Sequence, residues 1–356
     1  RSINYNYSLD DNIVIEQNKR VQEGLSTENL AFFWTHNIFS ETNIQDVNSY
    51  RPILLTSLAL DTSIFGPNFP KGSHLINIIL AVLLGIMVFT LINKHFGFES
   101  GVWALAITSL YMLHPMKVET IVNIKGRDDL IAMLCMVGIL LNVASKMKMS
   151  NWILVILFSF IGVFSKETMV VSPLIIIGFV FFIKKETIKT SLIRAIPTLF
   201  FCCLYLISRE LVLKEITIRV PDLTMNPFLA LEEPWMIRLA GGFSILYGII
   251  SSLVPISRLH HYYVGDFPND QYTVYLGLIL LIIMIGLGIW SLIKKKHFIS
   301  FCIGSIALFA VPTSNILITI PNAYNDRNWF IPSLFLFLLI IYLVKPMIKK
   351  PGYIYI

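Results

Sequence analysis

The chain has 356 residues; 55% of them are hydrophobic, only 14% are charged, and the formal net charge is +6. A soluble domain carries about a quarter of its residues as charged side chains, so this composition excludes a soluble binding protein. The basic residues fall in short clusters between apolar runs, which argues against nucleic acid as a partner. Apolar runs of about 20 residues recur, each long enough to cross a bilayer as a helix. Composition therefore predicts an all-α multi-pass membrane protein whose spans lie in a lipid bilayer.

Residues 1–72 begin with a mostly polar stretch, and we expect them to form the first outer, extracytoplasmic loop. Within this loop, the shorter segments 27–39 and 50–66 are amphipathic and predict helices at the membrane interface. The chain starts at Arg1 with neither a methionine nor a signal peptide. We therefore expect a further membrane span to precede it.

Beyond this loop we expect a transmembrane helical bundle over residues 73–346 and a short cytoplasmic tail over 347–356. About nine apolar runs in the bundle are long enough to be spans. The predicted spans are 73–93, 99–114, 128–145, 151–165, 168–183, 195–213, 271–293, 298–314 and 329–346.

Residues 236–254 allow two interpretations. Cytoplasmic turns carry an excess of Lys and Arg, and if this segment crossed the membrane, the three lysines at 294–296 would fall on the outer side. The segment and its end also contain Gly241, Gly248 and Pro255, which are typical of a broken helix. We therefore predict that residues 236–254 are re-entrant or interfacial and do not cross fully.

Cysteine and histidine do not predict a metal site. The cysteines lie within apolar runs and are expected to be small buried hydrophobic residues; they are Cys135, Cys202, Cys203 and Cys302. His260 and His261 with Asp266 are candidate ligands, but adjacent histidines on a loop are more often ordinary polar loop residues.

Six short polar motifs fall on the outer side in this topology. Charged side chains at span ends are costly in a chain so poor in charge and are often functional. We therefore expect them to gather at one membrane surface. The motifs are Asp10-Asp11, Tyr50-Arg51-Pro52, His114-Pro115 with Glu119, Gly126-Arg127-Asp128-Asp129, Ser165-Lys166-Glu167 and Asn325-Asp326-Arg327.

The order and spacing of these motifs resemble a known family of membrane enzymes. Asp10-Asp11 is similar to the acidic pair of class C glycosyltransferases. The remaining motifs resemble blocks of the transmembrane, TPR-containing protein O-mannosyltransferases. These blocks are Tyr50-Arg51-Pro52 through His74-Leu75-Ile76-Asn77, His114-Pro115 with Glu119, Gly126-Arg127-Asp128-Asp129-Leu130, Ser165-Lys166-Glu167 with Pro173-Leu174, and Pro312-x-Ser314-Asn315 with Asp326-Arg327. Within these 356 residues no TPR array follows residue 346, and Asp326 stands where the family has glutamate.

The resemblance implies a class C helical bundle with a catalytic first outer loop. It implies transfer of a sugar, with mannose as the candidate, from a polyprenyl- or dolichyl-phosphate donor to a protein Ser or Thr on the outer side. One base and one displacement imply an inverting reaction. An oligosaccharide ligase with a lipid-pyrophosphate donor is the nearest alternative. A transporter fits less well, because we find no clear acid in the middle of a span and no internal repeat. The sequence names no partner subunit.

Such a transfer needs a base for the acceptor hydroxyl and cations for the leaving phosphate. The base would be Asp10 or Asp11; alternatively, the pair forms a turn or caps a helix. Lysine and arginine bind phosphate oxygens, and the candidates for the donor phosphate are Arg51, Arg127, Lys166 and Arg327. Supporting roles, such as orienting these cations or the sugar hydroxyls, are expected for His114, Glu119, Asp128, Glu167 and Asp326.

Several of these residues also have structural alternatives. Arg127 could pair locally with Asp128 or Asp129, and Lys166 could extend to the membrane interface. Arg327 could pair with Asp326, and His114 could make a structural hydrogen bond beside its proline.

No cofactor is assigned from the sequence. Adjacent carboxylates such as Asp10 and Asp11 suit Mg²⁺ or Mn²⁺, whereas some class C families work without a metal. The sequence therefore allows both a metal-dependent and a metal-independent reaction, and it identifies no metal ligand. Frequent Asn, Ile and Lys favour a bacterial inner membrane, with the endoplasmic reticulum membrane as the alternative. The resemblance implies an active site on the extracytoplasmic or lumenal side.

Overall fold

A computed structural model describes residues 2–8, 10–41, 49–98, 100–213, 226–231, 233–253, 271–317, 320 and 323–348. Every regular element in these ranges is helical, which confirms the predicted all-α class. The α-helices are α1 (Lys19–Gln22), α2 (Thr27–Thr35), α3 (Pro52–Phe65), α4 (Pro70–His95), α5 (Gly101–Leu113), α6 (Lys117–Val122), α7 (Arg127–Val143), α8 (Met149–Ser165), α9 (Ser172–Gly178), α10 (Ile188–Leu213), α11 (Pro234–Leu253), α12 (Gln271–Ile293), α13 (His297–Ala310) and α14 (Pro332–Ile348). The 3-10 and π segments are η1 (Ser2–Asn4), η2 (Asn12–Glu16), η3 (Ile124–Gly126), η4 (Glu167–Val171), η5 (Phe179–Ile183), η6 (Pro227–Ala230), η7 (Val311–Thr313) and η8 (Asp326–Trp329).

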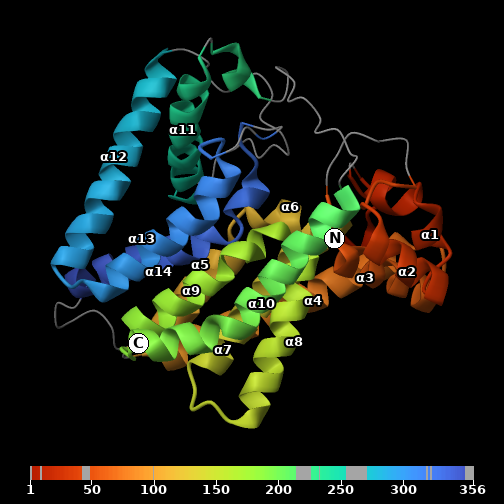
Figure 1. Cartoon of the computed structure of the whole chain (residues 1–356), viewed down its shortest axis with the longest axis horizontal. Coiled ribbons are helices and arrows are strands. Elements are labelled where there is room, and N and C mark those ends of the chain that lie inside the picture. Colours follow the sequence, from red (N-terminus) through yellow and green to blue (C-terminus); the bar gives the residue numbers. More distant parts are fainter. Residues whose placement is uncertain are drawn as a thin grey trace.

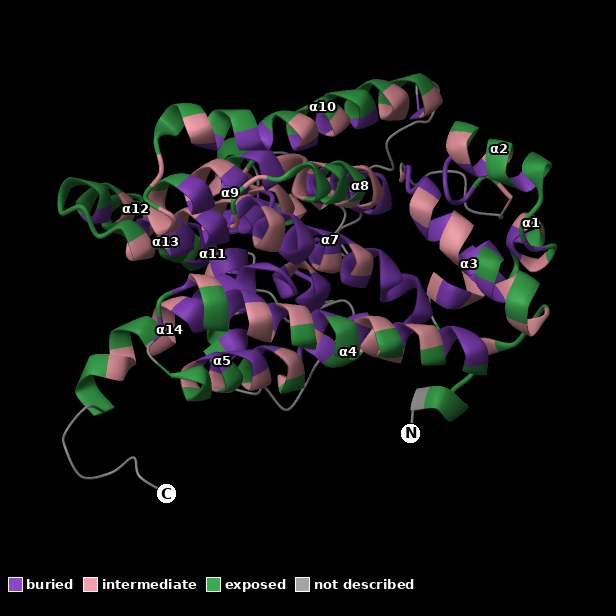
Figure 2. Cartoon of the chain, turned by 90° about the horizontal axis from the view of Figure 1, so that it is seen from below, coloured by how far each residue is buried: buried purple, intermediate pink, exposed green. Residues whose placement is uncertain are grey.

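Four helices, α4, α10, α11 and α12, are long and apolar enough to cross a membrane. Their outward faces are apolar as well: in α12, Ile282 and Ile285 are 60% and 62% exposed. Figure 2 shows exposed residues along the outer side of α10. Apolar surface of this extent is stable against lipid and not against water. The chain is therefore an integral membrane protein.

The predicted spans correspond to helices throughout the described part of the chain. The span 271–293 coincides with α12, and 73–93 lies within α4. Others, such as 99–114, are shorter helices of 10–17 residues. Because a crossing needs about 20 residues, the number of crossings and the bounds of the domains stay predictions.

The interpretation of 236–254 as a broken helix is wrong, because α11 runs unbroken through its glycines. These glycines serve close packing instead. A Cβ atom at Gly242 would come within 2.4 Å of the carbonyl oxygen of Gly277 in α12, and only small residues allow two helix backbones to approach so closely. The re-entrant or interfacial placement stays a prediction. Pro255, His260, His261 and Asp266 lie outside the described residues.

Helix α7 forms the centre of the bundle, packed between α4 and α8 (Figures 1 and 2). It is buried along most of its length, from Arg127 to Val143. At 1.5 Å per residue, its 17 residues span roughly 25 Å. Its first turn carries acids, whereas its far end meets Arg194, whose Nη1 donates to the carbonyl of Val143 at 2.6 Å. The acidic motif at the start of α7 and this arginine thus lie at opposite ends of one helix.

The N-terminal section forms a separate small unit, seen at the right of Figure 1. The predicted segments 27–39 and 50–66 are indeed helical, as α2 and α3. Ser26 caps α2 by accepting from the Asn29 backbone N–H at 3.0 Å, and proline begins α3. The unit has its own apolar core, which includes Ile124 from the bundle. Packing against Ile124 fixes the first loop on the end of the bundle.

Candidate active site

Six charged side chains from distant parts of the sequence converge at the end of the bundle where α7 begins. Three are acids: Asp10 just before η2, and Asp128 and Asp129 in the first turn of α7. Three are cations: Arg51 before α3, Lys166 after α8 and Arg327 in η8. Side chains from several of the predicted motifs therefore lie together, while the membrane side that they face stays a prediction.

Arg327 lies at the centre of this cluster and contacts three carboxylates loosely. Its Nη1 is 3.5 Å from Asp10, its Nε 3.4 Å from Asp129 and its Nη2 3.8 Å from Asp128. Burial alone would lower the pKa of Arg327, but Asp128 and Asp129 raise it above its usual range. The backbone N–H of Arg327 donates to the Asn325 side chain at 2.8 Å, which shapes the turn. A guanidinium with long contacts to several acids can exchange them for another anion.

Arg51 and Lys166, by contrast, are held tightly. Arg51 forms a two-point pair with Glu167, with Nε 2.9 Å from Oε2, and its Nη1 bonds to Asp128. Lys166 bonds to Asp129. These pairs join the start of α3, the start of α7 and the end of α8, and all their members are buried except Glu167, whose side chain is 43% exposed. Removing one member would leave an uncompensated buried charge, so their first role is to hold the site together.

Asp10 is the most accessible of the three carboxylates around Arg327. Its side chain is 20% exposed, against 0% for Asp128 and 3% for Asp129. It also lies 3.1 Å from Nζ of Lys125, whose pKa is lowered by burial and by Arg327. An acceptor hydroxyl can therefore reach Asp10 more easily than the buried pair.

Asp11 points away from the cluster and has a different environment. It is fully buried, and its two oxygens accept the backbone N–H groups of Ile124 at 3.1 Å and Lys125 at 2.7 Å. Burial raises the pKa of Asp11 to about 6, although these hydrogen bonds oppose the shift. Asp11 therefore fastens the first loop to η3. Of the two residues that the sequence left open as the base, the geometry favours Asp10.

Arg127 is not brought into the cluster. Its Nε donates to Asn77 at 2.8 Å, and its Nη2 pairs with Asp61. It is 1% exposed, and a further bond goes to the Ser57 carbonyl at 3.2 Å. It thus ties α3 and α4 to α7. The geometry favours this structural role over the phosphate contact that the motif predicts.

The other supporting candidates, Glu119, Asp326 and His114, also differ in how they relate to the charged cluster. Glu119 helps to raise the pKa of Arg327, which places its charge near the cluster. Asp326 accepts from the Tyr324 hydroxyl at 3.1 Å. His114 accepts from the Met116 backbone N–H at 3.3 Å and lies outside the cluster. Its observed role is the structural hydrogen bond that the sequence left open.

Sequence reasoning missed two members of the site. Asp129 belongs to a motif that we singled out, but only its neighbour was assigned a role. Lys125 directly precedes the same motif, and its position next to three charged residues was the available signal. Its pairing with Asp10 depends on the docking of the first loop, which no local pattern reveals.

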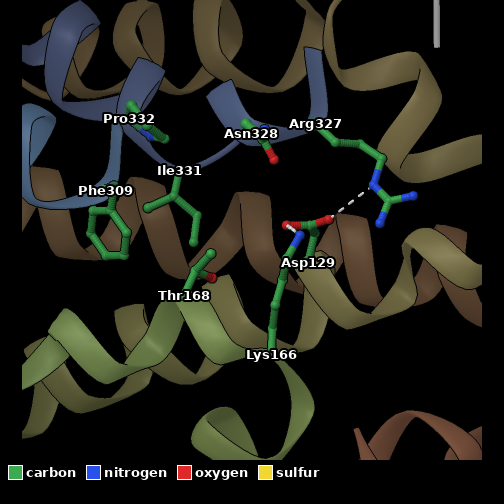
Figure 3. Close-up of a pocket in the computed structure, with 8 residues that line it drawn as sticks. All are labelled: Asp129, Lys166, Thr168, Phe309, Arg327, Asn328, Ile331 and Pro332. Carbon is green, nitrogen blue, oxygen red and sulfur yellow. Dashed lines mark hydrogen bonds and ion pairs between the residues drawn. The ribbon is translucent and has the colours of Figure 1, made fainter. Parts of the chain in front are cut away.

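A narrow pocket opens beside the cluster (Figure 3). Lys166, Asp129 and Arg327 form one wall, and the opposite wall is mainly apolar, with Phe309 and Ile331. Its volume of ≈ 10 Å³ holds about one water molecule. A larger ligand can enter only if the loose contacts of Arg327 open. The pocket is lined by Asp129, Lys166, Thr168, Phe309, Arg327, Asn328, Ile331 and Pro332.

A second cavity, of ≈ 230 Å³, lies in the N-terminal unit. Its walls carry amides, one acid and no cation. Gln22 braces the cavity: its side chain donates to the Ile15 carbonyl and accepts the Asn68 backbone N–H, both at 2.9 Å. The lining residues are Asn6, Tyr7, Glu16, Asn68 and Pro70.

Within the described residues, no group of three or more His, Cys, Asp or Glu side chains is placed to hold a metal ion. The carboxylates of the cluster instead have lysine or arginine as neighbours, as the contacts of Asp10 and Asp129 show. Such a set does not form the oxygen-rich cage of a hard divalent cation. The reaction proposed below therefore uses side chains of the cluster and no metal-bound step.

Comparison with known proteins agrees with the resemblance. No protein-family model and no solved structure matches the chain. Protein O-mannosyl-transferase TMTC4 of Mus musculus is 26% identical over 147 residues, 38% of this chain and 19% of that protein. Protein O-mannosyl-transferase Tmtc1 of Drosophila melanogaster is 27% identical over 180 residues, 49% of this chain and 20% of that protein. Protein O-mannosyl-transferase tmtc2 of Xenopus laevis is 31% identical over 102 residues, which are 27% of this chain and 12% of that protein.

The chain spans a fifth or less of the length of these relatives. The similarity therefore covers a part of each relative and not the whole protein. Over a quarter to a half of its own length, the chain is similar to proteins named protein O-mannosyl-transferases.

Proposed function

We propose that this protein is an inverting membrane glycosyltransferase that moves a sugar from a lipid phosphate to a Ser or Thr hydroxyl of a protein. One observation carries the proposal: Arg327 is held loosely among Asp10, Asp128 and Asp129, beside a pocket with an apolar wall. The names of the similar proteins support mannose as the sugar and a protein as the acceptor.

In the proposed reaction, the acceptor oxygen attacks the anomeric carbon from the face opposite the phosphate. The new C–O bond forms while the bond from the anomeric carbon to the phosphate oxygen breaks, and its electron pair leaves with the phosphate. The hydroxyl proton goes to the Asp10 carboxylate. An ionised aspartate needs only hydrogen-bonding distance to act as this base. A single displacement inverts the anomeric carbon.

The leaving lipid phosphate gains negative charge as the bond breaks, and cations must stabilise it. Arg327 and Lys166 both line the pocket. Arg327 is the stronger candidate, because a guanidinium binds phosphate oxygens in pairs and its present contacts, at 3.4–3.8 Å, are long. Lys166 would follow as a second contact. Arg51 keeps its two-point bond to Glu167 and holds Asp128 in place.

The apolar wall supports a lipid carrier for the sugar. Phe309 from α13, with Ile331 and Pro332 at the start of α14, faces the cations across the pocket (Figure 3). A polyprenyl phosphate has this combination of an anionic head and an apolar first isoprene unit. The lipid would reach the pocket along the membrane-facing helices.

The cavity in the N-terminal unit supports a place for the protein acceptor. All of its lining residues belong to the first loop, and one of them, Tyr7, lies near Asp11: burial raises the pKa of Tyr7 and the charge of Asp11 adds to the shift. Its amides suit the backbone of an extended peptide. A peptide there would have its hydroxyl side chain in the same unit as Asp10.

The decisive experiment supplies the purified protein in liposomes with polyprenyl-phosphate mannose and a Ser/Thr-rich peptide, and measures glycopeptide by mass spectrometry. We expect product with wild type, and a loss of about 10²–10⁴-fold with Asp10→Asn. Glu23→Gln, an exposed carboxylate in the same unit, is the matched control and should keep full activity. If wild type used a nucleotide sugar and not the lipid phosphate, the proposal would be wrong.

A further inference from the structure

A buried lysine outside the charged cluster holds the chain segment that follows Arg327. Lys117, the first residue of α6, is 1% exposed. Its Nζ donates to the carbonyl of Trp329 at 3.3 Å, to the carbonyl of Phe330 at 3.1 Å and to the Ser333 hydroxyl. A lysine ammonium has three donors, and these acceptors use all three. All of them lie within six residues of Arg327.

The surroundings of this ammonium are apolar and aromatic. Nζ lies 4.6 Å from the ring centre of Tyr111 and 5.0 Å from that of Phe330, distances at which a cation is attracted to an aromatic face. Burial lowers the pKa of Lys117 to about 7, while Asp326 and Asp129 oppose the shift. Burying a cation here is costly, and its hydrogen bonds to the segment after Arg327 offset a part of that cost.

The stretch around Arg327 is also held by α11. The indole of Trp329 fits against Gly248 so closely that a Cβ atom there would be 1.8 Å from Cε2 of the ring. Ser244 of α11 also donates to the Ala323 carbonyl at 2.6 Å. The turn that carries Arg327 is therefore held by contacts to both α6 and α11, and the guanidinium projects from a clamped backbone.

We infer that Lys117 is a positioning residue that sets the location of the Arg327 guanidinium by clamping residues 329–333. It does not contact the substrates. The inference rests on the proposed function in one respect only: the consequence of misplacing Arg327 is weaker use of the lipid-phosphate donor. A placement error of about 1 Å is enough to lower activity strongly.

The test compares Lys117→Met, which keeps length and removes the donors, with Lys117→Arg, which keeps them. We expect Lys117→Met to raise the donor KM about tenfold or more, since hydrogen bonds from a charged group are lost. The acceptor KM should not change, and Lys117→Arg should recover part of the loss. Equal donor KM values for wild type and Lys117→Met would overturn the inference.

A general loss of stability would give a different result in a double-mutant cycle. If Lys117 acts through Arg327, Lys117→Met should have little further effect on the donor KM in an Arg327→Ala background, because the two changes are not additive. Full additivity would overturn the inference.

Hydrogen exchange separates this inference from the proposed function, because it needs no activity. Lys117→Met should speed amide exchange at residues 326–333 and leave residues 131–140 of α7 protected. If wild type transferred no sugar, the proposed function would fail, while the clamp would still stand on this exchange. Unchanged exchange at 326–333 would overturn the clamp whatever the activity.

Discussion

Nη1 of Arg327 lies 3.5 Å from the carboxylate of Asp10, although the two residues come from opposite ends of the described chain. This contact puts the candidate base beside a candidate phosphate cation that lines the pocket. A donor whose phosphate binds Arg327 would have its anomeric carbon close to Asp10. The contact is also long enough to break when a phosphate enters. In the proposed single displacement, Asp10 would take the acceptor proton and Arg327 would bind the leaving phosphate.

Asp10→Asn and Asp11→Asn should differ in kind, because the first carboxylate faces the cluster and the second accepts two backbone N–H groups. Asp10→Asn should lower kcat by about 10²–10⁴-fold with little change in melting temperature. Asp11→Asn should chiefly lower stability, by about 1–3 kcal/mol. Rate assays and thermal unfolding in detergent check both. A loss of rate in Asp11→Asn with a loss of stability in Asp10→Asn would instead make Asp11 the base and Asp10 the structural residue.

The pH dependence of stability should report on Asp11. Its folded pKa of about 6 lies above the ordinary value, so the folded protein binds a proton more tightly than the unfolded chain. The contribution of Asp11 to stability should therefore fall as pH rises from about 4 to about 6. The difference in melting temperature between wild type and Asp11→Asn, followed over this range, should show that slope. A constant difference would contradict the shift.

Arg327→Ala should raise the donor KM by about 10²-fold, as expected for the loss of a charge-assisted phosphate contact of about 3 kcal/mol. Arg327→Lys should lie between wild type and alanine, because lysine keeps the charge without the two-point geometry. Initial rates over a range of polyprenyl-phosphate mannose concentrations give these values. Arg20→Ala, in a surface pair of the N-terminal unit, is the control and should leave the donor KM unchanged. Equal effects of both alanine variants would argue against a phosphate contact.

Arg127→Met should destabilise the protein and spare donor binding. It would leave Asp61 buried without its cation, which costs about 3–5 kcal/mol. We expect a large drop in melting temperature, with a wild-type donor KM in the fraction that stays folded. The double variant Arg127→Met with Asp61→Leu should recover part of the stability. A raised donor KM at normal stability would instead return Arg127 to the phosphate site.

The cavity of the N-terminal unit predicts a change in acceptor use. Glu16→Gln removes a charge and Tyr7→Phe removes a hydroxyl from its lining, and each should raise the KM for the peptide several-fold, by about 1 kcal/mol. The donor KM should stay constant. Glu28→Gln, at an exposed position on α2, serves as the control. Loss of donor binding in Glu16→Gln would remove the acceptor assignment.

The sequence predicted the helical class, the two N-terminal helices and the convergence of Asp10, Lys166 and Arg327. These follow from hydropathy and from the placement of charges at helix ends. The sequence does not predict in the same way which partners the Arg127 side chain faces. Residues 127 and 128 are about 100° apart around a helix, so neighbouring charges in one motif face different partners. Which of them faces the site depends on how α7 is rotated in the bundle.

Packing explains the remaining differences. Glycines in α11 were interpreted as breaks, but Gly242 and Gly248 allow close contact with α12 and with Trp329. Such contacts depend on partners far away in the sequence. Lys117 was missed for a related reason, since its bonding partners lie more than 200 residues away. A single lysine among apolar residues gives no local signal of this role.

The loose arrangement around Arg327 has a consequence for selectivity. Because Asp10, Asp128 and Asp129 already neutralise the guanidinium, a small soluble anion gains little by replacing them. A lipid-anchored phosphate gains more, since its isoprene chain adds contact with Phe309 and Ile331. The neutralisation of Arg327 by these carboxylates would therefore keep free phosphate and nucleotides out of the site. Ligands that arrive from the membrane would still bind there.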